Sequence, residues 1–361
     1  MGRKLELVRI GIPLFFSFYW RVFRGKKIGF SFNLADRCPL NCNCYWRAMG
    51  RTRELSDEQV RDFFRQKREE GHLLAAILGG EPYLRPKLLE QVVKIMPLNW
   101  VITSWTCPLR ELDNSIQFIS VDGDETTHDI LRGRIGLHSS LVRNVENFRK
   151  KGWQTPLFVH TVLNQYNFTQ IEPIVNFWQE SGLVKGIVFS TLTRIAGVND
   201  RHLSLSEDQQ ITAVNGLVLA KMFYGEFICM TQDAILNLLP LVTSGQTREN
   251  CPTSKLVTSF DASGVEIEKC IFSDRGICEE CGCAITGILK TLLDFHSFFK
   301  ITKVMMNLTP IKWTKNNRRP PVFFFSRKPR TLVRGWMLES LARSARLESI
   351  HENSKIKPQC V

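Results

Sequence analysis

The feature of this sequence that most constrains its fold is a regular alternation of short apolar runs and helix-like segments along residues 28–223. The apolar runs have the length expected of strands buried on both faces of a sheet. Repeated strand and helix units of this size indicate a parallel sheet, either closed or left open as a partial barrel. The expected strands are residues 28–34, 73–78, 100–104, 116–121, 156–163 and 187–191.

Helices between these strands are predicted from their N-terminal signals. Ser56 and Ser206 are each followed three residues later by a glutamine, which is the spacing of a capping box. Pro86 suits the first turn of another helix, and Asn167 is expected to cap a further one. In this kind of fold the functional residues belong on the loops after the strands. The expected helices are residues 56–70, 86–96, 139–151, 168–182 and 206–223.

Three cysteines, Cys38, Cys42 and Cys44, lie within seven residues on the loop after the first expected strand. Thiolates this close to one another converge on a metal rather than forming a disulfide. The chain has 361 residues and 11 cysteines, and in a chain this long such spacings indicate metal or catalytic sites. The sequence therefore predicts a metal centre at this strand end.

Polar residues and glycines follow several of the other strands. Paired glycines let a backbone approach a ligand closely, and the carboxylate that follows them can accept from an amine. A serine and a carboxylate after the fourth strand suit the hydroxyl groups of a ribose. Each of these loops taken alone could be a simple turn, so the prediction depends on their order. The candidate binding residues are Gly79, Gly80, Glu81, Pro82, Ser120, Asp122, Asn164 and Ser190.

With these loops in order, residues from about 28 to 223 resemble the radical S-adenosylmethionine enzymes. The run Gly79-Gly-Glu-Pro82 matches the loop after that family's second strand, and 119–133 looks like its fourth-strand region. The resemblance implies a partial (β/α)6 TIM-like barrel with a small cysteine-rich C-terminal extension. It also implies that three cysteines bind a [4Fe-4S] cluster, while the candidate binding residues hold S-adenosylmethionine. Its cleavage to a 5′-deoxyadenosyl radical would activate an unactivated carbon of the substrate.

The spacing of the three cysteines departs from that family's usual C-x3-C-x2-C pattern. Cys38, Cys42 and Cys44 read C-x3-C-x1-C, so a strict count would make Tyr45 the third ligand. We prefer Cys44, because the family commonly has an aromatic residue directly after its last cysteine, and Tyr45 occupies that place. The alternative is a degenerate Fe–S or zinc protein without catalytic activity.

A second group of cysteines follows the expected barrel. Gly264 is expected to turn a hairpin that brings two of them close to the C-x2-C-x-C run at 278–283. Four converging thiolates suit an Fe–S cluster or structural zinc. The pattern looks like the SPASM or twitch-like auxiliary-cluster extension of many radical enzymes. The preferred ligands are Cys251, Cys270, Cys278 and Cys281, with Cys283 as the next candidate.

The chain is basic, with a formal net charge of +13. Eight Lys and Arg occur in 312–334 without an acid, a pattern typical of a solvated tail. The aromatic run 10–23 and the segment 284–308 carry basic residues and could lie at a membrane interface or pack against the barrel. No apolar run is long enough to cross a bilayer. We expect a cytoplasmic protein, with a peripheral position at the membrane as the alternative.

Four regions are expected along the chain. They are a basic and aromatic segment 1–27, a radical enzyme barrel 28–245, an auxiliary-cluster region 246–286 and a basic amphipathic extension 287–361. The expected substrate is a peptide, a lipid-like molecule or another small molecule, and the expected electron donor is a ferredoxin or flavodoxin. A nucleic-acid-modifying radical enzyme is the remaining alternative, but only the basic charge supports it, and nucleic acid is not an expected partner.

Overall fold

The computed structural model describes residues 16–42, 52–198 and 200–293. Its eight strands form one sheet in the order β6-β5-β4-β3-β2-β1-β7-β8. Neighbouring strands from β6 to β7 are parallel, and only β8 runs antiparallel to its neighbour β7. The strands are β1 Gly29–Ala35, β2 Leu74–Gly79, β3 Leu98–Thr103, β4 Ser115–Ser120, β5 Leu157–Leu163, β6 Ile187–Thr191, β7 Val257–Phe260 and β8 Glu266–Ile267.

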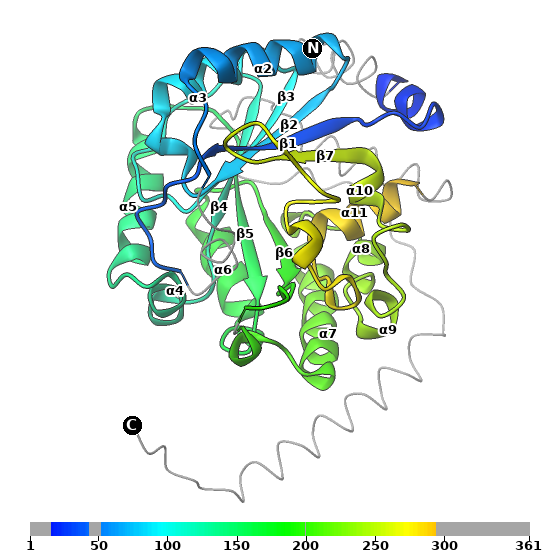
Figure 1. The fold of residues 1–361 in the computed structure, drawn as a ribbon. Helices are drawn as coiled ribbons and strands as arrows, with labels where there is room; N and C mark the ends of the chain where they lie inside the picture. The colour runs from blue at the N-terminus through cyan, green and yellow to red at the C-terminus, as the bar shows by residue number, and fades with distance from the viewer. Residues whose placement is uncertain (1–15, 43–51, 199, 294–361) are drawn as a thin grey trace, which may run out of the picture. The chain divides into compact units, whose positions relative to one another are not determined.

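The six predicted strands are confirmed, and they form an open barrel rather than a closed one. β6 forms one edge of the sheet. At the other edge, β1 pairs with β7, and β7 pairs with β8. The helices α2, α3, α5 and α7 surround the strands in Figure 1. The α-helices after β1 are α2 Asp57–Glu69, α3 Pro86–Val92, α4 Glu125–Arg132, α5 Leu137–Lys150, α6 Ile171–Ser181, α7 Glu207–Tyr224, α8 Gln232–Leu236, α9 Pro240–Thr243, α10 Pro252–Leu256 and α11 Ala284–Leu293.

Both predicted capping boxes are present. The Ser56 hydroxyl accepts from the Gln59 amide at 3.2 Å, and the Gln59 side chain accepts from the Ser56 amide at 3.0 Å. Ser206 and Gln209 repeat this exchange at the start of α7. Each reciprocal pair satisfies two amides that a helix N-terminus leaves without partners, which is why both helices begin where the sequence predicts.

The prediction that Asn167 caps a helix at 168 is wrong. α6 begins at Ile171, and the Asn167 side chain is buried in the preceding loop. Its amide nitrogen donates to the carbonyls of Asp122 and Val162, and its oxygen accepts from the Asn164 amide at 2.7 Å. The residue therefore fastens the loop after β5 to the loop after β4. Two further differences are that α3 ends at Val92 instead of 96 and that α4 was not predicted.

The core fills the space between the strands and the surrounding helices. All seven residues of β1 are buried, as expected of a strand with neighbours on both sides and cover on both faces. Phe30 on β1 packs edge-to-face against Phe64 of α2 and Phe260 of β7, with ring centroids 5.2 and 6.3 Å apart. Burying one such ring contributes about 2 kcal/mol. These contacts join the first and last parallel strands of the sheet.

The cysteine-rich region is attached to the sheet through β7, which pairs with β1 from Gly29↔Val257 to Phe32↔Phe260. Gly264 has a φ of 79° in the turn between β7 and β8, as predicted for the hairpin. The described residues all belong to one compact unit. The region boundaries predicted at 27, 245 and 286 stay predictions.

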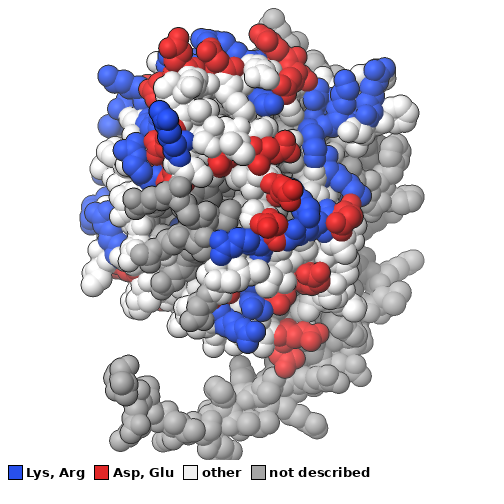
Figure 2. All heavy atoms as spheres, viewed as in Figure 1, with Lys and Arg blue, Asp and Glu red and all other residues white. Residues whose placement is uncertain are grey.

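On the face drawn in Figure 2, basic and acidic side chains are interspersed. The basic tail 312–334 and most of the extension 287–361 lie outside the described residues. Within the described part of the chain, no helix combines the length and the apolar character needed to span a membrane.

Candidate radical cluster and cofactor site

Cys38 and Cys42 lie on the loop after β1, and the two ends of that loop are tied together. The Arg37 guanidinium donates to both carboxylate oxygens of Glu54 at 3.1 Å, and the Asp36 amide donates to the same carboxylate at 3.0 Å. The Thr52 amide donates in turn to Asp36 Oδ2 at 2.8 Å. A bidentate arginine–carboxylate pair fixes geometry as well as contributing energy. The predicted third ligand Cys44, and its alternative Tyr45, lie outside the described residues.

Gly79 and Gly80 allow the loop after β2 to contact the cysteine loop directly. The Gly80 amide donates to the Ala35 carbonyl at 2.8 Å, and the Glu81 amide donates to the Arg37 carbonyl at 3.0 Å. A β-carbon on Gly79 would lie 2.2 Å from the Ala35 oxygen, and one on Gly80 would lie 2.2 Å from the Arg37 oxygen. Gly79 also has a φ of 130°, which disfavours other residues. Glycine is therefore required at both positions.

The structure places Glu81 away from the cavity, in the protein interior. One of its oxygens accepts from the Thr103 hydroxyl at 2.8 Å, and the other accepts from the amide and hydroxyl of Ser104. Its exposed fraction is 0%. Burial raises the pKa of the Glu81 carboxyl, and the bonds from Ser104 and Thr103 oppose that rise. Glu81 therefore joins β2 to β3, and Pro82, which begins a short 3-10 helix, is buried beside it.

A cavity of about 400 Å³ opens at the carboxyl ends of the strands, between the loops predicted to be functional. Its walls are largely aliphatic and aromatic, with side chains such as Leu78, Trp100 and Ile102. The structure brings 13 of the predicted site residues to this one cavity, although Glu81 and Pro82 are not among its lining residues. They are Cys38, Cys42, Gly79, Gly80, Ser120, Asp122, Asn164, Ser190, Cys251, Cys270, Cys278, Cys281 and Cys283.

Asp122 lies in a hydrogen-bonded corner of this cavity. Its carboxylate pairs with Arg132 at 2.7 Å and accepts from the Val162 amide at 3.2 Å. The Asp122 amide donates to His128 Nδ1 at 3.1 Å. Burial lowers the pKa of His128 to about 4, so the ring is neutral at pH 7 and can accept at Nδ1. Burial raises the pKa of the Cys38 thiol to about 11, and the positive charge of Arg132 partly opposes that rise.

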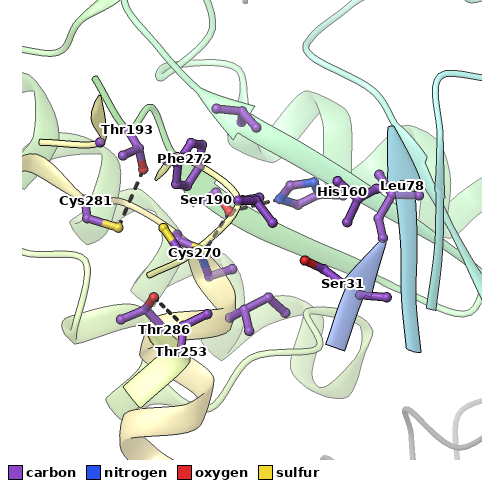
Figure 3. Close-up of a pocket in the computed structure, with 18 of the residues that line it drawn as sticks. Ser31, Leu78, His160, Ser190, Thr193, Thr253, Cys270, Phe272, Cys281 and Thr286 are labelled. Atoms are coloured by element: carbon purple, nitrogen blue, oxygen red, sulfur yellow. Dashed lines mark hydrogen bonds between the residues drawn. The ribbon is translucent and has the colours of Figure 1, made fainter. Parts of the chain in front are cut away.

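Polar side chains on β5 and β6 connect the barrel to the cysteine-rich region. Ser190 Oγ lies 2.9 Å from His160 Nε2 and accepts from the Ala284 amide at 3.1 Å (Figure 3). Burial lowers the pKa of His160 to about 4, which keeps this ring neutral. Asn164 is held by its own loop, since its Oδ1 accepts from the Tyr166 amide at 2.9 Å. Ser190 thus supports α11 as well as lining the cavity.

The five cysteines of the second group line the same cavity. Thr193 donates to Cys281 Sγ at 3.7 Å and accepts from the Gly282 amide at 3.1 Å (Figure 3). Cys283 lies directly before α11, and amides and the hydroxyl of its first turn donate to the Cys283 thiol. Burial raises the pKa of Cys270 and of Cys281 to about 12. Without a metal these thiols are neutral, whereas a bound metal would take them as thiolates.

The donor set at both ends of the cavity fits a thiolate-ligated metal group. Cys38 and Cys42 line the cavity from the loop after β1, and the second cysteine group supplies five further sulfur atoms to it. Among the described residues, no three His, Cys, Asp or Glu side chains lie close enough to ligate a single metal ion. Cys107 and Cys229 are not among the residues that line the cavity.

Three residues that sequence reasoning missed take part in this site. Arg132 pairs with Asp122 and occurs in the 128–133 run that suggested the family, so its charge was the available signal. His160 is a polar residue within the apolar strand β5. Thr193 follows β6, and no pattern in the nearby sequence marks it. Its role depends on Cys281, which is 88 residues away in the chain.

Comparisons with known proteins agree with the barrel. No protein-family model matches the chain. A Fe-coproporphyrin III synthase from Methanosarcina barkeri is 26% identical over 203 residues, which are 52% of this chain. The chain thus spans about half the length of this curated relative.

Solved structures give the same fold. Streptococcus suis SuiB bound to its precursor peptide SuiA has a TM-score of 0.55 and 13% identity, over 79% of this chain and 71% of SuiB. The enzyme anSMEcpe with bound AdoMet and the Cp18Cys peptide has a TM-score of 0.54 and 16% identity, over 77% of this chain and 83% of that protein. These relatives are radical S-adenosylmethionine enzymes. The resemblance to this enzyme family, and the partial barrel that it implies, are therefore confirmed.

Proposed function

We propose that this protein is a radical S-adenosylmethionine enzyme whose reaction takes place in the cavity at the carboxyl ends of the strands. The observation that carries the proposal is the shared position of Cys38, Cys42 and the Gly79–Gly80 backbone. These thiols and glycines come from neighbouring loops and line one cavity. A [4Fe-4S] cluster with S-adenosylmethionine would supply a reducing electron and a cleavable carbon–sulfur bond.

The proposed cofactor pocket uses the residues that the structure holds in fixed positions. Gly79 and Gly80 present backbone without side chains, which permits close approach of a polar ligand. Ser120 and Asp122 line the wall after β4, and Asn164 lines the wall after β5. Arg132 neutralises Asp122 and provides a cation near Cys38. Glu81 acts indirectly in this proposal, by fixing the loop that carries the two glycines.

We further propose an auxiliary [4Fe-4S] cluster in the second cysteine group, with zinc as the alternative. A single zinc ion draws its sulfur ligands to about 2.3 Å from one point. An Fe–S cluster is likewise held by cysteine thiolates, so the sulfur donors of this group suit either metal centre. The preferred ligands are Cys251, Cys270, Cys278 and Cys281, and Cys283, which is half-buried and lines the same cavity, is the next candidate.

The proposed substrate is one whose reacting part is apolar. The cavity walls include Phe30, Leu74, Trp100, Ile102 and Phe118, and these side chains would bury aliphatic or aromatic groups. SuiB and anSMEcpe are solved with peptides, which supports a peptide side chain as the first candidate. A lipid-like or other small molecule is the alternative. A ferredoxin or flavodoxin is the proposed electron donor.

The test is anaerobic reconstitution of the full chain with iron and sulfide, followed by reduction in the presence of S-adenosylmethionine. We expect 5′-deoxyadenosine by liquid chromatography from the wild type and none from Cys38→Ala. Cys107→Ala is the matched control, because Cys107 is a half-buried thiol that does not line the cavity. A wild-type sample with a reducible cluster that forms no 5′-deoxyadenosine would instead identify a non-catalytic Fe–S protein.

A further inference from the structure

A helix at residues 16–23 precedes β1 and is fixed to the rest of the structure along one side. Phe18 is buried, and Tyr19 and Val22 pack against the same core. Arg21 donates from Nε to the Lys27 carbonyl at 2.7 Å and from Nη1 to the Glu70 carbonyl at 3.2 Å. These contacts fix the rotation of the helix about its axis, and they therefore fix which side chains face outward.

The outward side of this helix carries large aromatic side chains. Trp20 is 58% exposed, Phe23 is 87% exposed and Phe16 is 67% exposed. Their spacing of four and three residues places them on one face of a helix. The inner positions Phe18 and Val22 lie on a different side of the same helix. Largely exposed aromatic rings gathered on one helix face mark a contact site more often than ordinary surface.

Basic residues accompany this aromatic stripe. The Arg24 guanidinium lies 4.3 Å from the centre of the Trp20 ring, and both Arg24 and Lys26 are exposed. The described residues provide no carboxylate partner for either cation. Lys and Arg side chains gather in Figure 2 where the helix lies in Figure 1. Along the sequence, residues 1–27 hold seven Lys and Arg and one Glu.

The charge determines which occupant suits this face. The chain's own segment 312–334 contains eight basic residues and no acid, so like charges would keep it away. An anionic surface complements Arg24 and Lys26. Trp and Phe side chains beside basic residues are the pattern of helices that lie in the headgroup region of a bilayer.

We propose that the face formed by Phe16, Trp20, Phe23, Arg24 and Lys26 binds the surface of an anionic phospholipid membrane. The aromatic rings enter the headgroup region, and the two cations contact lipid phosphates. Arg24 stays stacked on Trp20 and reaches the phosphates at the level of the indole ring. The helix lies along the membrane instead of crossing it. This inference concerns a surface remote from the radical chemistry and does not depend on that activity.

The experiment measures sedimentation of the full chain with vesicles of phosphatidylcholine alone and of phosphatidylcholine with 30 mol% phosphatidylglycerol, a composition chosen as about one anionic lipid in three. We expect binding to the anionic vesicles that weakens with salt. The double variant Trp20→Ser and Phe23→Ser should reduce the partition coefficient by roughly tenfold or more. Phe223→Ser on α7 is the matched control, because Phe223 is 84% exposed and belongs to another element. It should bind as the wild type does.

Two further measurements identify the contact. Arg24→Glu with Lys26→Glu should abolish the preference for anionic vesicles, and circular dichroism should show that these surface variants remain folded. Absence of binding to anionic vesicles at low salt overturns the proposal, as does unchanged binding of the Trp20 and Phe23 variant. Retention on immobilised polyglutamate without vesicle binding also overturns it, because that result identifies an acidic protein as the partner.

Discussion

The two thiol groups that share the cavity are held in place by different means. Cys38 and Cys42 sit on a loop whose backbone bonds directly to the loop after β2, through the amides of Gly80 and Glu81. The second group is held by backbone bonds to the end of β6 and the segment after it, such as Thr191 to Gly282 and Ile277 to Arg194, and in addition by the hydroxyls of Thr193 and Ser190. The contacts of the first group join the loops of successive strands and leave a motif in the sequence, whereas those of the second group join segments far apart in the chain and do not.

The largest effect should come from placing a side chain where two backbones touch. Gly80→Ala puts a β-carbon 2.2 Å from the Arg37 carbonyl, so the loops must separate. We expect a loss of about 3 kcal/mol in the free energy of unfolding and failure to retain the first cluster. Thermal unfolding and iron content measure the two effects. Gly245→Ala is the control, since a β-carbon there meets nothing within 4 Å. If Gly80→Ala and Gly245→Ala lose the same stability and iron, the backbone contact between the loops does not hold the first cysteine group.

The second prediction concerns acid stability of the Asp122 corner. The folded pKa of His128 is about 4, below its ordinary value of 6.5, so the unfolded chain binds more protons between these pH values. His128 therefore contributes its full stability above pH 6.5, and the contribution is lost as pH falls toward 4. The loss at pH 4 should be about 3 kcal/mol. Urea unfolding at several pH values across this range measures the free energy of unfolding. That free energy should depend less steeply on pH in His128→Asn than in the wild type. The exposed His202→Asn should keep the wild-type slope.

The third prediction tests whether Glu81 supports the loop or contacts the cofactor. Glu81→Gln replaces one acceptor oxygen by an amide group while Thr103 and Ser104 still donate toward it. We expect a loss of about 2 kcal/mol in the free energy of unfolding, measured in urea. Binding of S-adenosylmethionine to the reconstituted protein should change little at a temperature where the variant is folded. Unchanged stability with lost cofactor binding would instead place Glu81 at the ligand.

The smallest effect is expected from removing one hydroxyl contact of the second cysteine group. Thr193→Val removes the donor to Cys281 and the acceptor for the Gly282 amide, at a cost of about 1 kcal/mol. If the sulfur belongs to a cluster, loss of the hydrogen bond should also lower its reduction potential, which an electron paramagnetic resonance titration measures. Thr191→Val is the matched control, because the buried Thr191 hydroxyl has no partner among the described residues. A potential that moves equally in both variants would contradict the assignment.

These differences explain how much the sequence could predict. Strand positions, both capping boxes and the Gly79–Gly80 loop follow from local patterns, and the structure contains all of them. Asn167 was misassigned because an asparagine before a helix can satisfy loop carbonyls as readily as helix amides. Glu81 faces inward because Thr103 and Ser104 on the next strand supply its donors, and no pattern within its own loop reveals them. Interactions between distant segments require the folded chain.

The parallel pairing of β7 with β1 has a consequence for electron flow. The first thiols follow β1 directly, and Cys251 precedes β7 by only the five residues of α10. Cys38 and Cys42 on one side and Cys251 on the other are thus attached to adjacent strands of one hydrogen-bonded sheet. If both cysteine groups hold clusters, this shared sheet would fix the distance between the two attachment points. The rate of electron exchange between the clusters would then depend chiefly on their reduction potentials.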